Sequence, residues 1–171
     1  MTRSVQIIGT GQLLELSRRL KAAGGPRLKA NFARRIRHAA EPLATGMQQT
    51  IRSLPIKADP RKAGKRGGPS PTTRPLRATV AGAVRTSIRT SGNPGARVWI
   101  DRASLPLDLR DMPSTMNSAN GRIRHQVFGN RKRWHNNWTT PLWWEKTVRA
   151  HQPRMEREVA RVVDDVKNDL S

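Results

Sequence analysis

Residues 122–144, RIRHQVFGNRKRWHNNWTTPLWW, hold four of the five tryptophans of this 171-residue chain and no acidic residue. Apolar and polar side chains alternate from Ile123 to Val127, a period of two that predicts a strand ending before Gly129. The Asn and Thr residues that precede Pro141 favour a loop, because they neither continue a strand nor open a helix well. A helix then begins within residues 142–144. The segment therefore predicts a strand, an aromatic and cationic loop, and a helix start.

The part of the chain before residue 54 is predicted to be mainly helical. Residues 5–8 are a short apolar run typical of an edge strand, and residues 12–23 place leucines on one face of a helix. Residues 26–52 repeat apolar side chains every three or four positions, which predicts a long amphipathic helix. Its apolar stripe indicates a core-facing surface or, alternatively, a subunit contact. Pro42 lies inside this helix and is expected to kink it.

Between residues 75 and 100 a helix is expected to be followed by a β-hairpin. Residues 75–84 repeat apolar positions every four residues, and residues 86–100 alternate with a period of two around a Gly- and Asn-containing turn. Trp99 falls on the opposite face of this hairpin from Val98 and Ile100, so we expect it to be partly exposed or at an interface.

Two expectations complete the C-terminal half. The strand that begins at Arg122 is expected to join the hairpin as a third member. The closing helix is expected from Leu142 to the end of the chain, with Pro153 causing either a kink or a division into two segments. Together the elements predict an α+β fold. A small antiparallel sheet of three to four strands packs against a long N-terminal helix and a C-terminal helix, in a single domain over residues 1–171.

A long basic arm is expected at residues 54–75, where Pro, Gly and cationic residues leave little to bury. If the arm binds nucleic acid, its cations contact phosphates; if it is an assembly arm, they meet acidic surface on a neighbouring subunit. A solvated linker is the third alternative. The cations concerned are Lys57, Arg61, Lys62, Lys65 and Arg66.

The composition narrows the class of protein. The formal net charge is +21, which favours an anionic partner such as nucleic acid or an acidic protein, or simply a solvated Arg-rich surface. The absence of cysteine excludes disulfide scaffolds and thiolate metal sites. No apolar run is long enough for a membrane span and the N-terminus lacks a signal-peptide segment, so we expect a soluble protein made in a cytoplasm.

The sequence predicts neither an enzyme nor a bound cofactor or metal. Its four histidines show no ligand spacing, and no nucleotide-binding loop or nucleophile with an adjacent base is present. Asp101, Asp108 and Asp111 form the one acidic cluster before the last helix. They are as well suited to forming turns or pairing with Arg102 and Arg110 as to holding a metal ion.

The order of elements and several phrases resemble the tail-completion and head-to-tail joining proteins of long-tailed phages, especially those of actinobacterial hosts. The most specific phrases are LRATVAGAVRTSIRTSG, at residues 76–92, and HQVFGNRKRW, at residues 125–134. The family commonly has H-P-V-F-G-N at this turn, whereas Gln126 stands here in place of the proline. Residues 135–138 also differ from the segment that is usual in the family, so the resemblance does not specify the partner of these residues.

The resemblance implies a non-enzymatic virion protein of the phage neck, assembled in the bacterial cytoplasm. It would form a homo-oligomeric ring, a hexamer, that caps the tail tube and joins it to the head connector, with DNA passing through without sequence-specific binding. A head-tail adaptor or stopper ring, or a basic nucleic-acid-binding module, are the alternatives. The aromatic group could instead be a purely local core with no partner. The hypothesised interface residues are Trp99, Phe128, Arg131, Lys132, Arg133, Trp134, Trp138, Trp143 and Trp144.

Overall fold

The computed structural model describes residues 4–8, 11–22, 25–58, 75–92, 94–127 and 130–169. It is an α+β fold with two three-stranded antiparallel sheets, as the sequence predicts for the fold class. The first sheet has the strand order β1-β4-β3 and the second has the order β2-β6-β5. The strands are β1 (Ser4–Ile8), β2 (Lys57–Ala58), β3 (Val84–Arg89), β4 (Gly95–Ile100), β5 (Arg122–Val127) and β6 (Asn130–Trp138).

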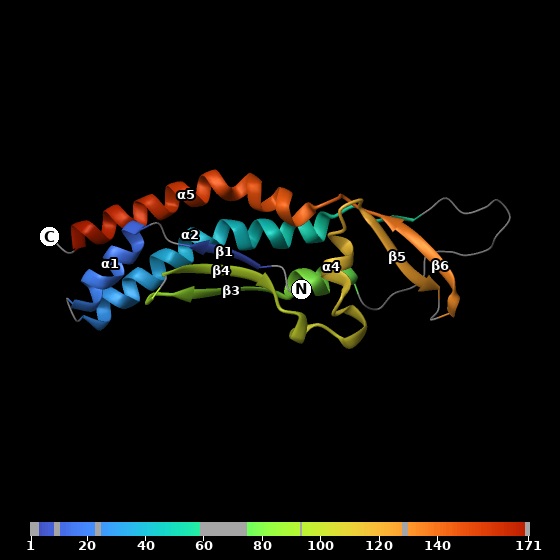
Figure 1. Ribbon diagram of the computed structural model, residues 1–171, viewed down its shortest axis with the longest axis horizontal. Helices are drawn as coiled ribbons and strands as arrows, with labels where there is room; N and C mark the ends of the chain where they lie inside the picture. The colour runs from blue at the N-terminus through green and yellow to red at the C-terminus, as the bar shows by residue number, and fades with distance from the viewer. Residues whose placement is uncertain are drawn as a thin grey trace.

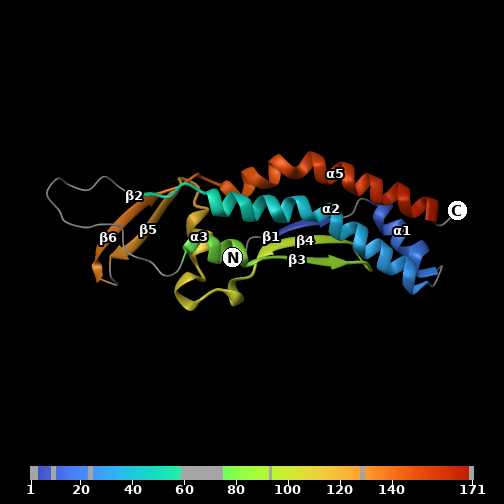
Figure 2. The same cartoon turned by 180° about the vertical axis from the view of Figure 1, so that it is seen from behind.

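The two longest helices lie on one side of the first sheet (Figure 1). Helix α2 (Pro26–Ser53) packs on β3 and β4, and α5 (Trp143–Asp169) packs along the other side of α2. The order of layers is therefore α5, α2 and then the first sheet, and the same order is seen from behind (Figure 2). The shorter helices are α1 (Gly11–Ala22), α3 (Leu76–Gly82) and α4 (Met112–Met116), with 3-10 turns at Arg102–Ser104 and Leu107–Leu109.

The apolar stripe of α2 is core, as predicted. Its first half packs with Leu13 and Leu16 of α1 and with the C-terminal half of α5. Its second half packs with α3, with β3 and β4, and with the start of α5. Because α2 contributes to both clusters, it is the central structural element of the molecule. The buried residues of α2 are Phe32, Ile36, Ala39, Ala40, Leu43, Gly46, Met47 and Ile51.

The closing helix is one continuous element. Pro153 lies inside α5, so the alternative of two separate segments is wrong. A proline in a helix removes one backbone hydrogen bond and bends the axis, and α5 is visibly bowed in Figure 1. The helix begins at Trp143, because Leu142 adopts a left-handed φ of 49° that no regular helix contains.

Asn117 anchors the start of α5 from a distant part of the chain. Its side-chain oxygen accepts a hydrogen bond of 2.7 Å from the backbone N–H of Trp144, and its amide donates to Glu145 at 2.8 Å. Backbone N–H groups in the first turn of a helix have no partner within the helix. The buried Asn117 therefore provides the acceptor that this helix end requires.

One predicted strand pairing and one predicted loop are wrong, although the strand from Arg122 to Val127 itself is confirmed. The strand from Arg122 does not extend the hairpin of β3 and β4; β1 takes that place, paired with β4 along its length. The expected loop over residues 130–138 is instead strand β6, which pairs with β5. Asn is a poor strand former, but in β6 the cross-strand partners decide the conformation. One such contact is the hydrogen bond of 2.8 Å that Arg122 Nε donates to Asn136.

Gly46 permits the close packing of α2 on α5, and this yields a prediction. A Cβ at position 46 would lie 2.3 Å from Nε2 of His151 in α5. Alanine is favoured over glycine in a helix by about 1 kcal/mol, whereas overpacking costs about 1–3 kcal/mol. We expect Gly46→Ala to lower the free energy of unfolding by about 1 kcal/mol in urea denaturation. In a His151→Ala background the same change should be stabilising, and a loss there would contradict the proposed clash.

Candidate functional site

Among the described residues, no helix covers the face of the first sheet that points away from α2, which we call the Trp99 face. In the register of β3 and β4, Arg85 lies opposite Trp99 and Ser87 lies opposite Arg97. These four side chains point away from α2, since Val98 and Ile100, which alternate with them, are buried against it. The guanidinium of Arg97 lies over the Trp99 ring at 5.2 Å from its centroid. Trp99 is half-buried, as predicted from its place on the face of β4 opposite to that of Val98.

The second sheet lies beyond the ends of α2 and α5 and carries a similar but more exposed face (Figure 1). Trp134 and Trp138 are 46% and 44% exposed, and the register places Arg122 and Lys57 opposite Trp138. Arg124 stacks over Trp134 with its guanidinium carbon 4.4 Å from the ring centroid. We call this surface the Trp134 face; its residues are Lys57, Arg122, Arg124, Trp134, Asn136 and Trp138.

The opposite face of the second sheet meets the body of the molecule at Ile123. Ile123, which alternates with Arg122 and Arg124, is 2% exposed and belongs to the same apolar cluster as Leu43 and Trp143. The sheet is therefore anchored on one side and exposed on the other. This alternation follows directly from the period of two in β5.

Two hypothesised interface residues are part of the subunit core instead. Trp143 is 1% exposed and Trp144 is 4% exposed, and their rings meet edge to face with centroids 5.8 Å apart. Because they begin α5 rather than end a loop, their side chains turn inward toward α2 and Asn117. The hypothesis that Trp143 and Trp144 contact another subunit is therefore wrong, because both side chains are buried within their own subunit.

The other predicted residues have different outcomes. Lys132 and Arg133 are exposed in β6, beside the bulge where the pairing of β5 and β6 shifts register. The start of the predicted arm, residues 54–75, belongs to the folded part of the molecule. Its first residue, Leu54, is buried, and Lys57 is exposed in strand β2 of the second sheet. Phe128 and the side chain of Arg131 lie outside the described residues, as do the arm residues Arg61, Lys62, Lys65 and Arg66.

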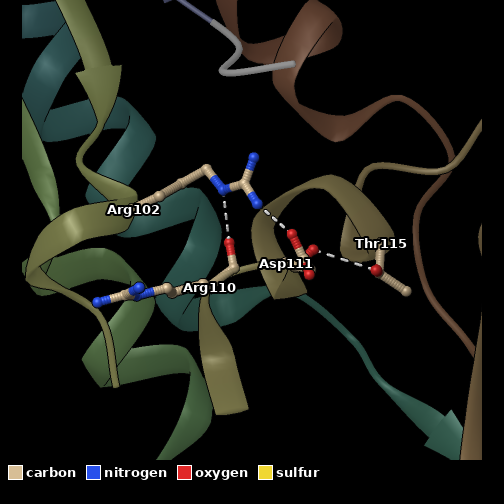
Figure 3. A network of polar contacts seen from close by, with 4 residues as sticks. All are labelled: Arg102, Arg110, Asp111 and Thr115. Carbon is tan, nitrogen blue, oxygen red and sulfur yellow. Dashed lines mark hydrogen bonds and ion pairs between the residues drawn. The ribbon is translucent and has the colours of Figure 1, made fainter. Parts of the chain in front are cut away.

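Two members of the acidic cluster form a turn and pair with arginine. The Asp101 carboxylate accepts a hydrogen bond of 3.1 Å from the backbone N–H of Ala103. Asp111 pairs with Arg102 (Figure 3). Arg102 Nε also donates to the carbonyl oxygen of Arg110 at 2.8 Å. These contacts fix the irregular segment between the two sheets. Among the described residues, no three histidines or acids are grouped so that they could hold a metal ion.

Comparisons with known proteins were made for the whole chain. No protein-family model, curated protein or solved structure matches it. The phage resemblance of residues 76–92 and 125–134 therefore remains a prediction. Of their described residues, the first segment contains α3 and β3, and the second contains the end of β5 and the start of β6. Within the described part of the chain, every helix is too short or too polar to span a lipid bilayer.

The sequence indicated the tryptophans of both faces but missed the side chains that accompany them. Arg85 and Arg97 surround Trp99, and Arg122, Arg124 and Asn136 surround Trp134 and Trp138. Strand alternation in the sequence could have placed Arg85 and Arg97 on the same face as Trp99. For the second group, alternation in β5 could have placed Arg122 and Arg124 on one face, but it holds no information about Asn136 and the tryptophans of β6, which lie in a segment whose composition favours a loop.

Proposed function

We propose that this protein is a structural subunit of the neck of a long-tailed phage. In this role it forms a homo-oligomeric ring, a hexamer, that completes the tail tube and joins it to the head connector. The proposal rests on the resemblance of residues 76–92 and 125–134 and on one structural observation. That observation is that the two opposite sides of the subunit differ, one being a sheet face with a tryptophan among arginines and the other the outer side of a helix.

The first of these surfaces is the Trp99 face and the second is the outer side of α5. They lie on opposite sides because α2 separates the first sheet from α5 (Figure 2). The Trp99 face carries Arg85, Arg89 and Arg97 around a half-buried tryptophan. The exposed side of α5 carries charges of both signs, with Glu156 and Asp164 together with Arg157 and Arg161. A closed ring requires such heterologous contacts, in which one patch meets a different patch of the next subunit. Tryptophan and arginine are the residue types that most often dominate interface energies.

A substitution in the Trp99 face tests the ring. The mass of the nuclease-treated protein should be measured by light scattering at low and at about half-molar salt, where exposed charge pairs are screened. We expect an oligomer in both conditions for the natural chain, formed alone or on addition of the tail-tube protein. Trp99→Glu should reduce the mass to that of a single 19.2 kDa chain, because it places a carboxylate in the contact.

The matched control is Trp134→Ala with Trp138→Ala, which changes the other aromatic face and should leave the mass unchanged. A natural chain that remains monomeric under all these conditions would contradict the ring. An oligomer that binds head-connector but not tail-tube protein would favour the adaptor or stopper alternatives.

A further inference from the structure

The Trp134 face combines two exposed aromatic rings with a group of cations. Trp134 and Trp138 lie four residues apart on one face of β6, which places them about 13 Å from each other along the strand. Lys57, Arg122 and Arg124 are all exposed on the same face. None of the strands β2, β5 and β6 contains an acidic residue. The face therefore offers stacking surfaces within a field of positive charge.

The arginines of this face are held by their neighbours. Arg124 is stacked on the Trp134 ring, and Arg122 is fixed through the hydrogen bond from its Nε to Asn136. Only one nitrogen of Arg122 is used in that bond, so its two terminal amino groups can donate to a further acceptor. A guanidinium oriented in this way matches the geometry of a phosphate.

The counter-charge for this face must come mainly from another kind of molecule. The net charge of the chain is +21, and it has 12 acidic residues. Several of these already have partners inside the subunit, so a second copy offers few carboxylates to the Trp134 face. The acids with such partners are Glu15, Glu41, Asp111, Glu145, Glu158 and Asp165.

We propose that the Trp134 face binds single-stranded nucleic acid without sequence preference. Aromatic rings on a sheet stack with bases of any type, and a surrounding cationic surface follows the phosphates. Single strands are favoured over duplex because their bases are unstacked and accessible to Trp134 and Trp138. This activity goes beyond the ring-forming role and uses a surface distinct from the Trp99 face.

Binding is tested with the nuclease-treated full-length protein and fluorescein-labelled oligothymidine of about 12 nucleotides, within the usual site size of such surfaces. Fluorescence anisotropy should show binding at least about 10-fold tighter than to a duplex of the same length. Trp134→Leu with Trp138→Leu should weaken the affinity about 10-fold or more, since leucine keeps an apolar side chain but cannot stack. Arg122→Ala should reduce the slope of log affinity against log salt by about 0.7.

The matched control is Trp99→Leu, which alters the other tryptophan with a stacked arginine and should leave the affinity within about twofold. Melting temperatures of all variants show whether each one folds. Equal binding to polyglutamate and oligothymidine, or an affinity unchanged in the folded double tryptophan variant, would overturn the proposal. Light scattering on the same variants keeps the two proposals separate, because loss of the ring should follow Trp99 and loss of oligonucleotide binding should follow Trp134 and Trp138.

Discussion

Trp143→Ala is expected to lower the free energy of unfolding by about 4 kcal/mol, the cost of emptying a large buried aromatic site. Trp143 is 1% exposed and packs edge to face on Trp144 at the start of α5. Its carbonyl oxygen accepts a hydrogen bond of 2.7 Å from Thr147, whose hydroxyl also lies 3.2 Å from that of Thr50 in α2. Alanine keeps that carbonyl, but loss of the indole leaves a cavity in the apolar cluster that joins the start of α5 to α2. Chemical denaturation followed by circular dichroism measures the change.

Two further variants define the origin of this loss. Trp138→Ala removes an indole that is 44% exposed and should cost about 1 kcal/mol or less. Trp143→Phe keeps an aromatic ring and removes Nε1, a buried donor without an acceptor among the described residues, so it should cost much less than alanine. If Trp143→Ala left stability unchanged but altered the oligomeric mass, Trp143 would be an interface residue and its assignment to the core would be wrong.

Gly121→Ala is expected to lower the free energy of unfolding by about 3 kcal/mol, from backbone strain and steric overlap together. Gly121 has a φ of +71°, a left-handed conformation that disfavours any Cβ. A Cβ there would also lie 2.3 Å from the backbone oxygen of Thr139. The position joins the end of β6 to the start of β5, because Thr139 N–H donates to the Gly121 carbonyl at 2.7 Å. The second sheet should therefore be displaced or loosened.

Gly92 provides the matched control for this prediction. Its φ of +69° is nearly the same, but a Cβ at position 92 would meet no atom within 4 Å. Gly92→Ala should then lower the free energy of unfolding only through the strained left-handed backbone, by about 1 kcal/mol. Equal losses of stability for the two variants, measured by urea denaturation, would show that the contact with Thr139 is unimportant.

Elements with strong local periodicity were predictable from the sequence. The stripe from Phe32 to Ile51 fixed α2 as a core helix, and the alternation of Val98, Trp99 and Ile100 gave both the hairpin and the exposure of Trp99. In these segments, burial and secondary structure depend on the same pattern. The α+β class followed from the order of these elements.

Elements that depend on distant partners were not predictable. Strand β6 contains Asn136, Asn137 and several cations, and it forms because β5 pairs with it and β2 covers its other edge. Likewise β1, rather than β5, occupies the free edge of β4. The burial of Trp143 depends on where α5 begins, which Asn117 determines from 27 residues away along the chain. Periodicity holds no information about such contacts.

The two aromatic faces give the subunit a division of roles. The Trp99 face is paired with a helix surface of mixed charge in the proposed ring, whereas the Trp134 face lies on the sheet at the end of the molecule, whose described strands contain cations and no acids. Both contain a tryptophan stacked by an arginine. Their different surroundings, and not their residue types, determine which partner each one fits.

The ring is the central claim, and electron microscopy of the purified, nuclease-treated protein mixed with tail-tube protein tests it most directly. We predict closed rings with sixfold symmetry in class averages, seated on the end of the tube. The same mixture prepared with Trp99→Glu should show bare tube ends. Single subunits scattered in the background, with tube ends equally bare for the natural chain, would contradict the account.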